Sequence, residues 1–172
     1  MKKISFQTDV LPLKNQLFRM ALRITLNRAE AEDVVQETMI KVWNRRDEWE
    51  QIASMEAFCL TICRNLSLDK IRRMENQLRD AGDSAAEPQD SSYTSNPEEQ
   101  TVQHDRVALV RRLIGELPEK QRTAMQLRDI EGKAYKEIAI VMGITEEQVK
   151  VNIFRARQTI KRKFKEQEEY GL

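Results

Sequence analysis

The fold of this chain is decided by a stretch at residues 142–165, which reads MGITEEQVKVNIFRARQTIKRKFK. At about 100° per residue, one narrow stripe of a helix collects its apolar side chains: Val149, Ile153, Ala156, Ile160 and Phe164. The opposite face presents Lys150, Val151, Phe154, Arg155, Gln158 and Arg162. A helix with one packed seam and one cationic face, entered through a tight glycine turn, is typical of a recognition helix for the DNA major groove.

The composition of the exposed face favours a binding role over simple solvation, which is the usual role of a basic helix face. Seven Lys or Arg residues and no acid lie between Gln148 and Lys165, and interspersed acids would repel phosphate. Val151 and Phe154 also lie on this face, where a helix that is only solvated has no use for apolar groups. They are suited to thymine methyl groups or to the apolar surface of a partner.

The residues before this helix complete a helix-turn-helix. Residues 135–142 have the apolar spacing of a short helix, and Gly143 follows them at the turn. Thr145 is placed to cap the last helix, and Gln148, three residues later, is placed to close a capping box. The sequence therefore predicts a DNA-binding unit in this part of the chain.

The whole chain is predicted to be all-α, with two small helical domains joined by a flexible acidic linker. It has 172 residues and a formal net charge of +1. Residues 1–79 carry 14 bases and 11 acids, residues 80–105 carry seven acids and no Lys or Arg, and residues 106–172 carry 15 bases and 10 acids. The middle segment is rich in Ser, Pro and acids, so it has too little apolar surface to fold alone, and it is long for a loop inside a compact domain.

Apolar spacing predicts the other helices, and no segment alternates like a strand. The helices run from about 11 to 26, 28 to 45 and 55 to 77 in the first domain, and from about 107 to 117, 118 to 130 and 135 to 142 in the second. Asn27 can cap the second helix, with Glu30 closing a capping box. Pro118 suits the first turn of its helix, and Gly132 suits the end of that helix.

The residue types argue against a metal, a cofactor or an enzyme. Cys59 and Cys63 lie one helical turn apart; two ligands do not make a zinc site and a disulfide within one helix has poor geometry, so we expect both thiols to be buried. No nucleophile–base pair, phosphate loop or metal cluster is apparent, so we expect no catalytic activity, no cofactor and no small-molecule substrate. The charged N-terminus precedes no apolar run, and no stretch approaches membrane-spanning length, so we expect a cytoplasmic protein.

Motifs in both halves carry a family resemblance. In the first domain they are AEDVVQE at residues 31–37 and ICRNLSLDKIRR at residues 62–73. In the second they are LPEKQR at residues 117–122, YKEIA at residues 135–139 and FRAR at residues 154–157. In this order they resemble the two conserved domains of extracytoplasmic-function (ECF) sigma factors of bacterial RNA polymerase. The resemblance implies that the first domain binds the core polymerase and melts the −10 element of promoter DNA, that the second reads the −35 element, and that the linker threads the polymerase interior.

The resemblance also implies roles for individual side chains. Those that face the polymerase are Asp33, Gln36, Glu37 and Ile40. Those that match the part capturing a flipped base of the −10 element are Arg45, Trp49 and Asn65, although Trp49 suits a core anchor equally well. Those expected to hold phosphates near the −10 element are Arg64, Lys70, Arg72 and Arg73. Those at the −35 element are Lys150, Val151, Phe154 and Arg155, the face already derived from spacing.

One departure from the family and three rival functions bear on this interpretation. Many members have Trp-Leu-aromatic-Arg where this chain has Phe58-Cys59-Leu60-Thr61, so their −10 sequence preference is not transferred. The first rival is a stand-alone helix-turn-helix regulator that binds operators without polymerase, and the second is an all-helical adaptor with no DNA role. A magnesium nuclease built on the acids at residues 30–37 lacks a nearby His or Lys. The family further implies an anti-sigma factor as partner, often membrane-anchored, that clamps both domains.

Overall fold

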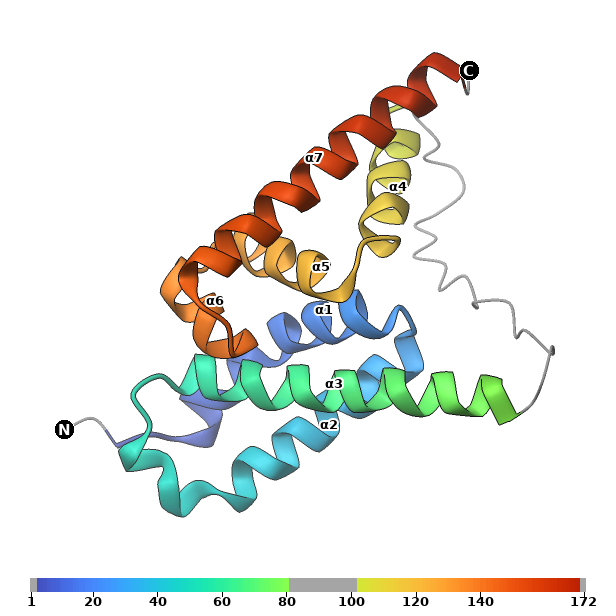
Figure 1. Ribbon diagram of the computed structural model, residues 1–172. Helices are drawn as coiled ribbons and strands as arrows, with labels where there is room; N and C mark the ends of the chain where they lie inside the picture. The colour runs from blue at the N-terminus through green and yellow to red at the C-terminus, as the bar shows by residue number, and fades with distance from the viewer. Residues whose placement is uncertain (1–2, 81–101, 171–172) are drawn as a thin grey trace.

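The computed structural model describes residues 3–80 and 102–170, and the regular elements in these ranges are helices (Figure 1). The first region, residues 3–80, contains α1 (Lys14–Thr25), α2 (Arg28–Asn44) and α3 (Met55–Asp80). Short helical segments precede α1 (Phe6–Val10 and Leu11–Leu13) and join α2 to α3 (Arg46–Gln51). The second region, residues 102–170, contains α4 (Val102–Gly115), α5 (Glu119–Met125), a π-helical turn (Gln126–Ile130), α6 (Tyr135–Met142) and α7 (Glu146–Tyr170).

The predicted all-α architecture with two helical regions is confirmed, and several helix boundaries differ by a few residues. The first helix begins at Lys14, because Pro12 lies in a tight helical turn ahead of it. Pro at such a position loses no helical hydrogen bond. The predicted linker at 80–105 lies mostly outside the described residues, and its last part belongs to α4, which begins at Val102.

The junction between α1 and α2 is set by two local devices. Leu26 ends α1 in the left-handed conformation with φ 56°, a backbone state that costs a non-glycine residue free energy. The Asn27 side chain then accepts a hydrogen bond of 3.0 Å from the Glu30 amide and caps α2. The Glu30 carboxylate lies 3.3 Å from the Lys70 ammonium of α3 and pairs with it, while the Asn27 backbone amide donates to the Thr25 hydroxyl, so the predicted capping box is not closed by Glu30.

The helix-turn-helix is formed as the sequence predicts. Gly143 adopts φ 65°, the left-handed state that favours glycine, and ends α6. The amide of Thr145 donates to the Gln148 side chain at 3.0 Å, and the amide of Gln148 donates to the Thr145 hydroxyl at 3.1 Å. This reciprocal capping box fixes the residue at which α7 begins.

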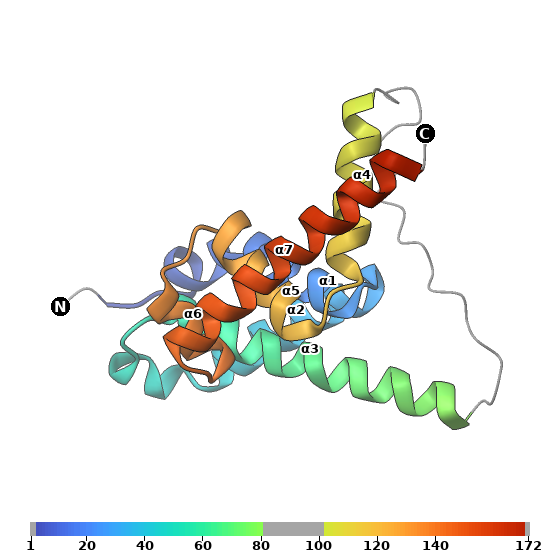
Figure 2. The same cartoon turned by 45° about the horizontal axis from the view of Figure 1, so that its top comes forward.

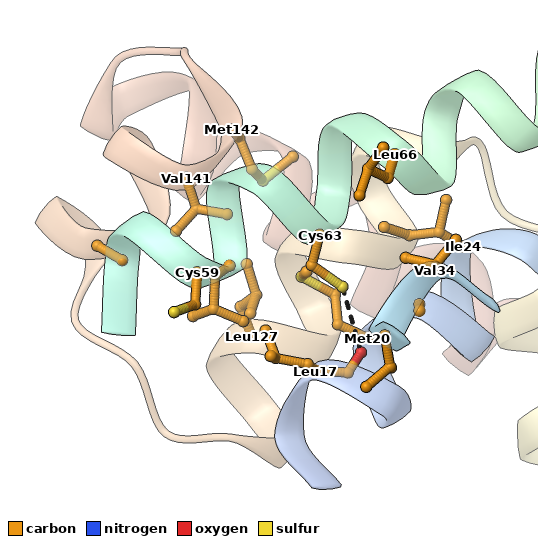
Figure 3. Packing of buried hydrophobic residues seen from close by; sticks show 14 of the residues in the cluster. Leu17, Met20, Ile24, Val34, Cys59, Cys63, Leu66, Leu127, Val141 and Met142 are labelled. Atoms are coloured by element: carbon orange, nitrogen blue, oxygen red, sulfur yellow. Dashed lines mark hydrogen bonds between the residues drawn. The ribbon is translucent and has the colours of Figure 1, made fainter. Parts of the chain in front are cut away.

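The core of the first region is formed where α1, α2 and α3 meet (Figure 3). Leu17, Met20 and Val34 are fully buried there. Cys63 is buried among them, and its thiol donates to the Leu17 carbonyl oxygen at 3.4 Å. Burial raises the pKa of both Cys59 and Cys63 to about 12. The prediction that these cysteines are buried, unpaired thiols is confirmed.

The two regions do not lie apart but pack against each other. α6 contacts α3 and α5 contacts α1, so that Leu127, Val141 and Met142 of the second region join the same buried cluster as the first region's core (Figures 1 and 3). A second, smaller cluster lies between α4 and α7 and includes Leu113 and Ile160. Figure 2 shows these two helices extending side by side away from the shared core. We call this packing of the two regions the closed arrangement.

Candidate nucleic-acid and polymerase surfaces

The first candidate surface is the outward face of α7. Val149 and Ile153 are buried against the shared core, and their position fixes the rotation of the helix. Val151 and Phe154 therefore point outward, and Phe154 is 60% exposed. An exposed phenyl ring on a helix that already has a packed seam is suited to a partner. The face that spacing predicts is the face that the fold exposes.

Cations flank this apolar pair. Arg155 is exposed, and no acidic side chain among the described residues pairs with it. The Lys150 ammonium lies 5.3 Å from the centroid of the Tyr135 ring, a cation–π contact that holds it beside α6. Arg157 turns the other way and pairs with Asp129, whose hydrogen bond raises the pKa of the guanidinium. Lys150 and Arg155 are thus the cations that lie beside Val151 and Phe154 on this face.

The second candidate surface is the outward face of α2. Asp33 and Gln36 are exposed, Glu37 is half-buried, and Ile40 is 58% exposed. The opposite side of the helix is buried through Val34 and other apolar residues. The face thus combines acids with one large apolar side chain, and the closed arrangement leaves it uncovered.

A hollow of about 440 Å³ opens between the end of α2 and the middle of α3. It is lined by Lys41, Asn44, Arg45, Ile62, Asn65, Leu66 and Asp69. The structure therefore brings together two of the three residues predicted for base capture, Arg45 and Asn65. Lys41, Asn44 and Asp69 also line the hollow and were not predicted. Lys41 and Asn44 lie in the last turn of α2, and Lys41 is three residues before Asn44 and four before Arg45, which caps the helix. This spacing is the signal that could have found Lys41 and Asn44.

Trp49 does not line this hollow. Its side chain is buried, and its indole nitrogen donates to the Val42 carbonyl oxygen at 3.0 Å. Of the two roles considered for Trp49, the structure gives it the core-anchor role. The neighbouring Trp43 is 46% exposed and contacts the rings of Phe6 and Trp49 edge-on.

The cations predicted to hold phosphates differ in whether an acidic side chain already pairs with them. Lys70 lies 3.3 Å from Glu30, and Arg72 pairs with Asp69 at the rim of the hollow. Arg73 is exposed, and no described acidic side chain pairs with it. Of these three, Arg73 is the cation most available to an approaching phosphate.

Arg64, the fourth predicted phosphate ligand, is buried at the boundary between the two regions. Its guanidinium lies 2.6 Å from the Glu119 carboxylate of α5 and donates to the Met142 carbonyl oxygen of α6 at 3.3 Å. Only 7% of Arg64 is exposed. In the closed arrangement this side chain contacts the second region and has no access to DNA.

Arg122 makes the reciprocal contact from the second region. Its guanidinium donates to the Ile24 carbonyl oxygen at the end of α1 at 2.9 Å, and to the carbonyl oxygens of Gly115 and Leu117. Burial lowers the pKa of Arg122, with the negative charge of Glu119 opposing that effect. Further contacts join Arg19 to Glu131, Arg23 to Gln126 and Lys133 to Glu56. The closed arrangement is therefore held by buried ionic contacts as well as by apolar packing.

Residues 3–80 and 102–170 contain no group of three or more His, Cys, Asp or Glu side chains that could hold a metal ion. Over the same ranges, no helix has the length and apolar character needed to cross a membrane.

Each of the two regions matches a known protein family. Residues 10–77 match the family described as Sigma-70 region 2, and residues 108–160 match Sigma-70, region 4. The chain is 31% identical over 149 residues to ECF RNA polymerase sigma factor SigE of Mycolicibacterium smegmatis, covering 86% of this chain but only 56% of that relative. It is 30% identical over 148 residues to sigma factor SigL of Mycobacterium tuberculosis, covering 84% of this chain and 80% of SigL.

Solved structures share the fold. A sigma factor RpoE, solved in complex with the anti-sigma factor NepR from Bartonella quintana, superposes with a TM-score of 0.71 at 23% identity, over 91% of this chain and 94% of that one. CnrH, solved with the cytosolic domain of CnrY, superposes with a TM-score of 0.65 at 21% identity, over 91% of this chain and 84% of that one.

Proposed function

The chain belongs to the extracytoplasmic-function (ECF) family of RNA polymerase sigma factors, and from that membership we propose that it binds core RNA polymerase and directs transcription initiation at promoters with −10 and −35 elements. One observation carries the proposal: a complete helix-turn-helix and an uncovered acidic–apolar face on α2 occur in one chain. A stand-alone DNA-binding regulator needs the first of these but not the second. The proposal gives the chain no catalytic activity of its own.

We assign polymerase binding to the outward face of α2. Asp33, Gln36 and Glu37 offer carboxylates and an amide, and Ile40 offers an apolar centre between them and the end of the helix. Protein interfaces commonly combine an apolar contact with charges that choose the partner. A partner with a basic rim and an apolar patch fits this face.

We assign the −35 element to the outward face of α7. Lys150 and Arg155 can hydrogen-bond to base edges or phosphates, and Val151 and Phe154 can contact thymine methyl groups. Each specific base contact is worth roughly 1–3 kcal/mol of discrimination. The capping box supports this role, because a helix with a fixed start presents the same side chains to each site.

We assign capture of an unstacked −10 base to the hollow between α2 and α3. An extruded base needs an apolar wall and a group that hydrogen-bonds its edge. Ile62 and Leu66 supply the wall, and Asn65 supplies a carboxamide. Arg73 is free to hold the neighbouring phosphate, whereas Arg64 becomes available only when the two regions separate.

Promoter geometry requires that separation. The two elements lie about 25 base pairs apart, which at 3.4 Å per base pair is roughly 85 Å of duplex. A 25-residue helix such as α7 is about 37 Å long, and it is among the longest elements of the closed arrangement. A compact body of that size cannot bind both elements at once. We therefore propose that the closed arrangement opens on the polymerase.

We further propose that a regulatory protein of the anti-sigma class binds the closed arrangement. Of two proteins that share the fold, RpoE was solved with the anti-sigma factor NepR, and CnrH was solved with the cytosolic domain of CnrY. A protein that grips both regions at once favours the closed arrangement by its difference in affinity for the two states.

Run-off transcription with core polymerase tests the proposed function. We expect the protein to initiate at a cognate promoter, and we expect Lys150→Ala with Arg155→Ala to abolish initiation that depends on the −35 element. The matched control is Arg106→Ala with Lys163→Ala, which removes the same charge from cations paired with Glu168 and Glu116. Failure of the wild-type protein to co-elute with core polymerase would favour the stand-alone regulator instead.

A further inference from the structure

The recognition face of α7 does not end at Arg155. At about 100° per residue, Gln158, Arg162 and Lys165 fall within about 40° of Val151 around the helix. All three are exposed. The same outward stripe therefore runs for 14 further residues beyond Val151, or about 21 Å along the helix axis at the usual rise of 1.5 Å.

The stripe forms one wall of a groove of about 540 Å³ between α7 and the start of α5. The lining residues are Gln121, Arg155, Gln158, Thr159, Lys161, Arg162 and Lys165. Four of the seven are cations, and none is an acid. The Gln121 side-chain oxygen is buried and has no hydrogen-bond partner among the described residues.

The cations of this groove are left unpaired while their neighbours are not. Arg157 pairs with Asp129 and Lys163 pairs with Glu116 on other sides of the same helix. Over residues 3–80 and 102–170, no acidic side chain pairs with the four groove cations. Unpaired cations gathered around a polar hollow are suited to an anionic ligand.

We propose that this groove binds the phosphate backbone of the DNA beside the −35 element, and so extends the footprint of α7 beyond its base contacts. This inference rests on the proposed function, because it takes the N-terminal half of α7 to lie in the major groove. A straight helix leaves a curved groove after a few turns, so its C-terminal half passes over a phosphate strand. Arg155 belongs to both the base-reading face and the groove, and this continuity favours DNA over an acidic protein.

Salt dependence separates this role from base reading. Each phosphate contact adds about 0.9 to the slope of log affinity against log salt. We compare the full-length wild type with Arg162→Ala/Lys165→Ala on a 30-base-pair duplex selected from a random pool and on an unselected duplex. Loss of two phosphate contacts predicts that the ratio of wild-type affinity to variant affinity falls about 12-fold between 50 and 200 mM salt. The loss should be equal on both duplexes, since phosphates carry no sequence information.

Arg157→Ala/Lys163→Ala is the matched control, since it removes the same two charges from the same helix at paired positions, and we expect its salt slope to be that of the wild type. An unchanged slope for Arg162→Ala/Lys165→Ala overturns the inference. A defect confined to transcription with an added activator protein would also overturn it, by assigning the groove to an acidic partner. The proposed function is judged separately: a protein that fails in run-off transcription but keeps the predicted salt slopes loses the polymerase role and retains the groove.

Discussion

The ion pair between Arg64 and Glu119 is one of the buried contacts that join the two regions, and Glu119→Gln tests how much it stabilises the closed arrangement. Glutamine keeps the shape of the side chain and can still bond to Arg64 and to the Thr123 hydroxyl, which lies 3.1 Å from Glu119. The substitution removes only the negative charge. Arg64 then remains at the boundary between the two regions as a buried cation without its counter-charge.

The size of the effect follows from burial. Removing one partner of a buried ion pair costs about 3–5 kcal/mol. The Glu119 side chain is 18% exposed and the hydrogen bonds survive, so we expect about 2 kcal/mol. At 1.4 kcal/mol for each tenfold change, the ratio of open to closed protein rises roughly 30-fold.

Distance-dependent fluorescence transfer between the two regions measures this ratio. Dyes placed at Gln51→Cys, four residues before α3 begins, and at Lys136→Cys in α6 report on opening, because α6 packs against α3 in the closed arrangement (Figure 1). Burial raises the pKa of Cys59 and Cys63 to about 12, so the native thiols stay protonated and do not compete for the label. We expect lower transfer in Glu119→Gln and earlier binding of core polymerase in a titration.

Glu116→Gln is the control for charge alone. Glu116 pairs with Lys163 at the surface, where its side chain is 50% exposed, and such pairs contribute about 0–1 kcal/mol. Transfer in this variant should match the wild type. If Glu119→Gln also matches the wild type, the ion pair does not hold the regions together and the reasoning from burial is refuted.

Three further predictions concern the fold and the α2 face. Thr145→Ala removes the cap of α7 and should lower the free energy of unfolding by about 1 kcal/mol in urea titrations; no change would mean that the cap is dispensable. Ile40→Asp should weaken binding to core polymerase at least tenfold, or about 1.4 kcal/mol, in a pull-down titration, while the equally exposed Ile140→Asp should not. Because burial raises the pKa of Cys59 and Cys63 from 9.0 to about 12, their contribution to stability is complete below pH 9 and is lost as the pH rises toward 12. The double Ala variant should therefore lose less unfolding free energy over that range, and equal losses in calorimetry would contradict the assignment.

Local features of this fold were predictable from sequence. The capping box of Thr145 and Gln148, the turn at Gly143 and the exposure of Phe154 follow from residue type and helical spacing, which act within a few residues. The role of Arg64 was not predictable in the same way. A helical wheel indicates which side of α3 a residue occupies, but not that α5 and α6 cover that side. Its burial depends on contacts with residues 55 and 78 positions away, which a periodicity analysis does not detect.

The hollow between α2 and α3 illustrates the same limit. Asn65 was expected near Arg45 only from the family resemblance, and the resemblance also nominated Trp49, which lies in the core. The indole lies in the core, where its nitrogen donates a hydrogen bond to the Val42 carbonyl oxygen. That hydrogen bond depends on the turn between α2 and α3, whose path the sequence left undefined.

The shared apolar cluster has a thermal consequence. Opening the closed arrangement uncovers side chains from both regions, Leu66 and Met142 among them, and hydration of newly exposed apolar surface raises the heat capacity. The equilibrium between open and closed protein is then curved in temperature, with the closed population passing through a maximum. Both cooling and warming away from this maximum should raise the open population. A change of temperature in either direction would therefore favour the open protein, which we propose is the form that binds promoter DNA on the polymerase.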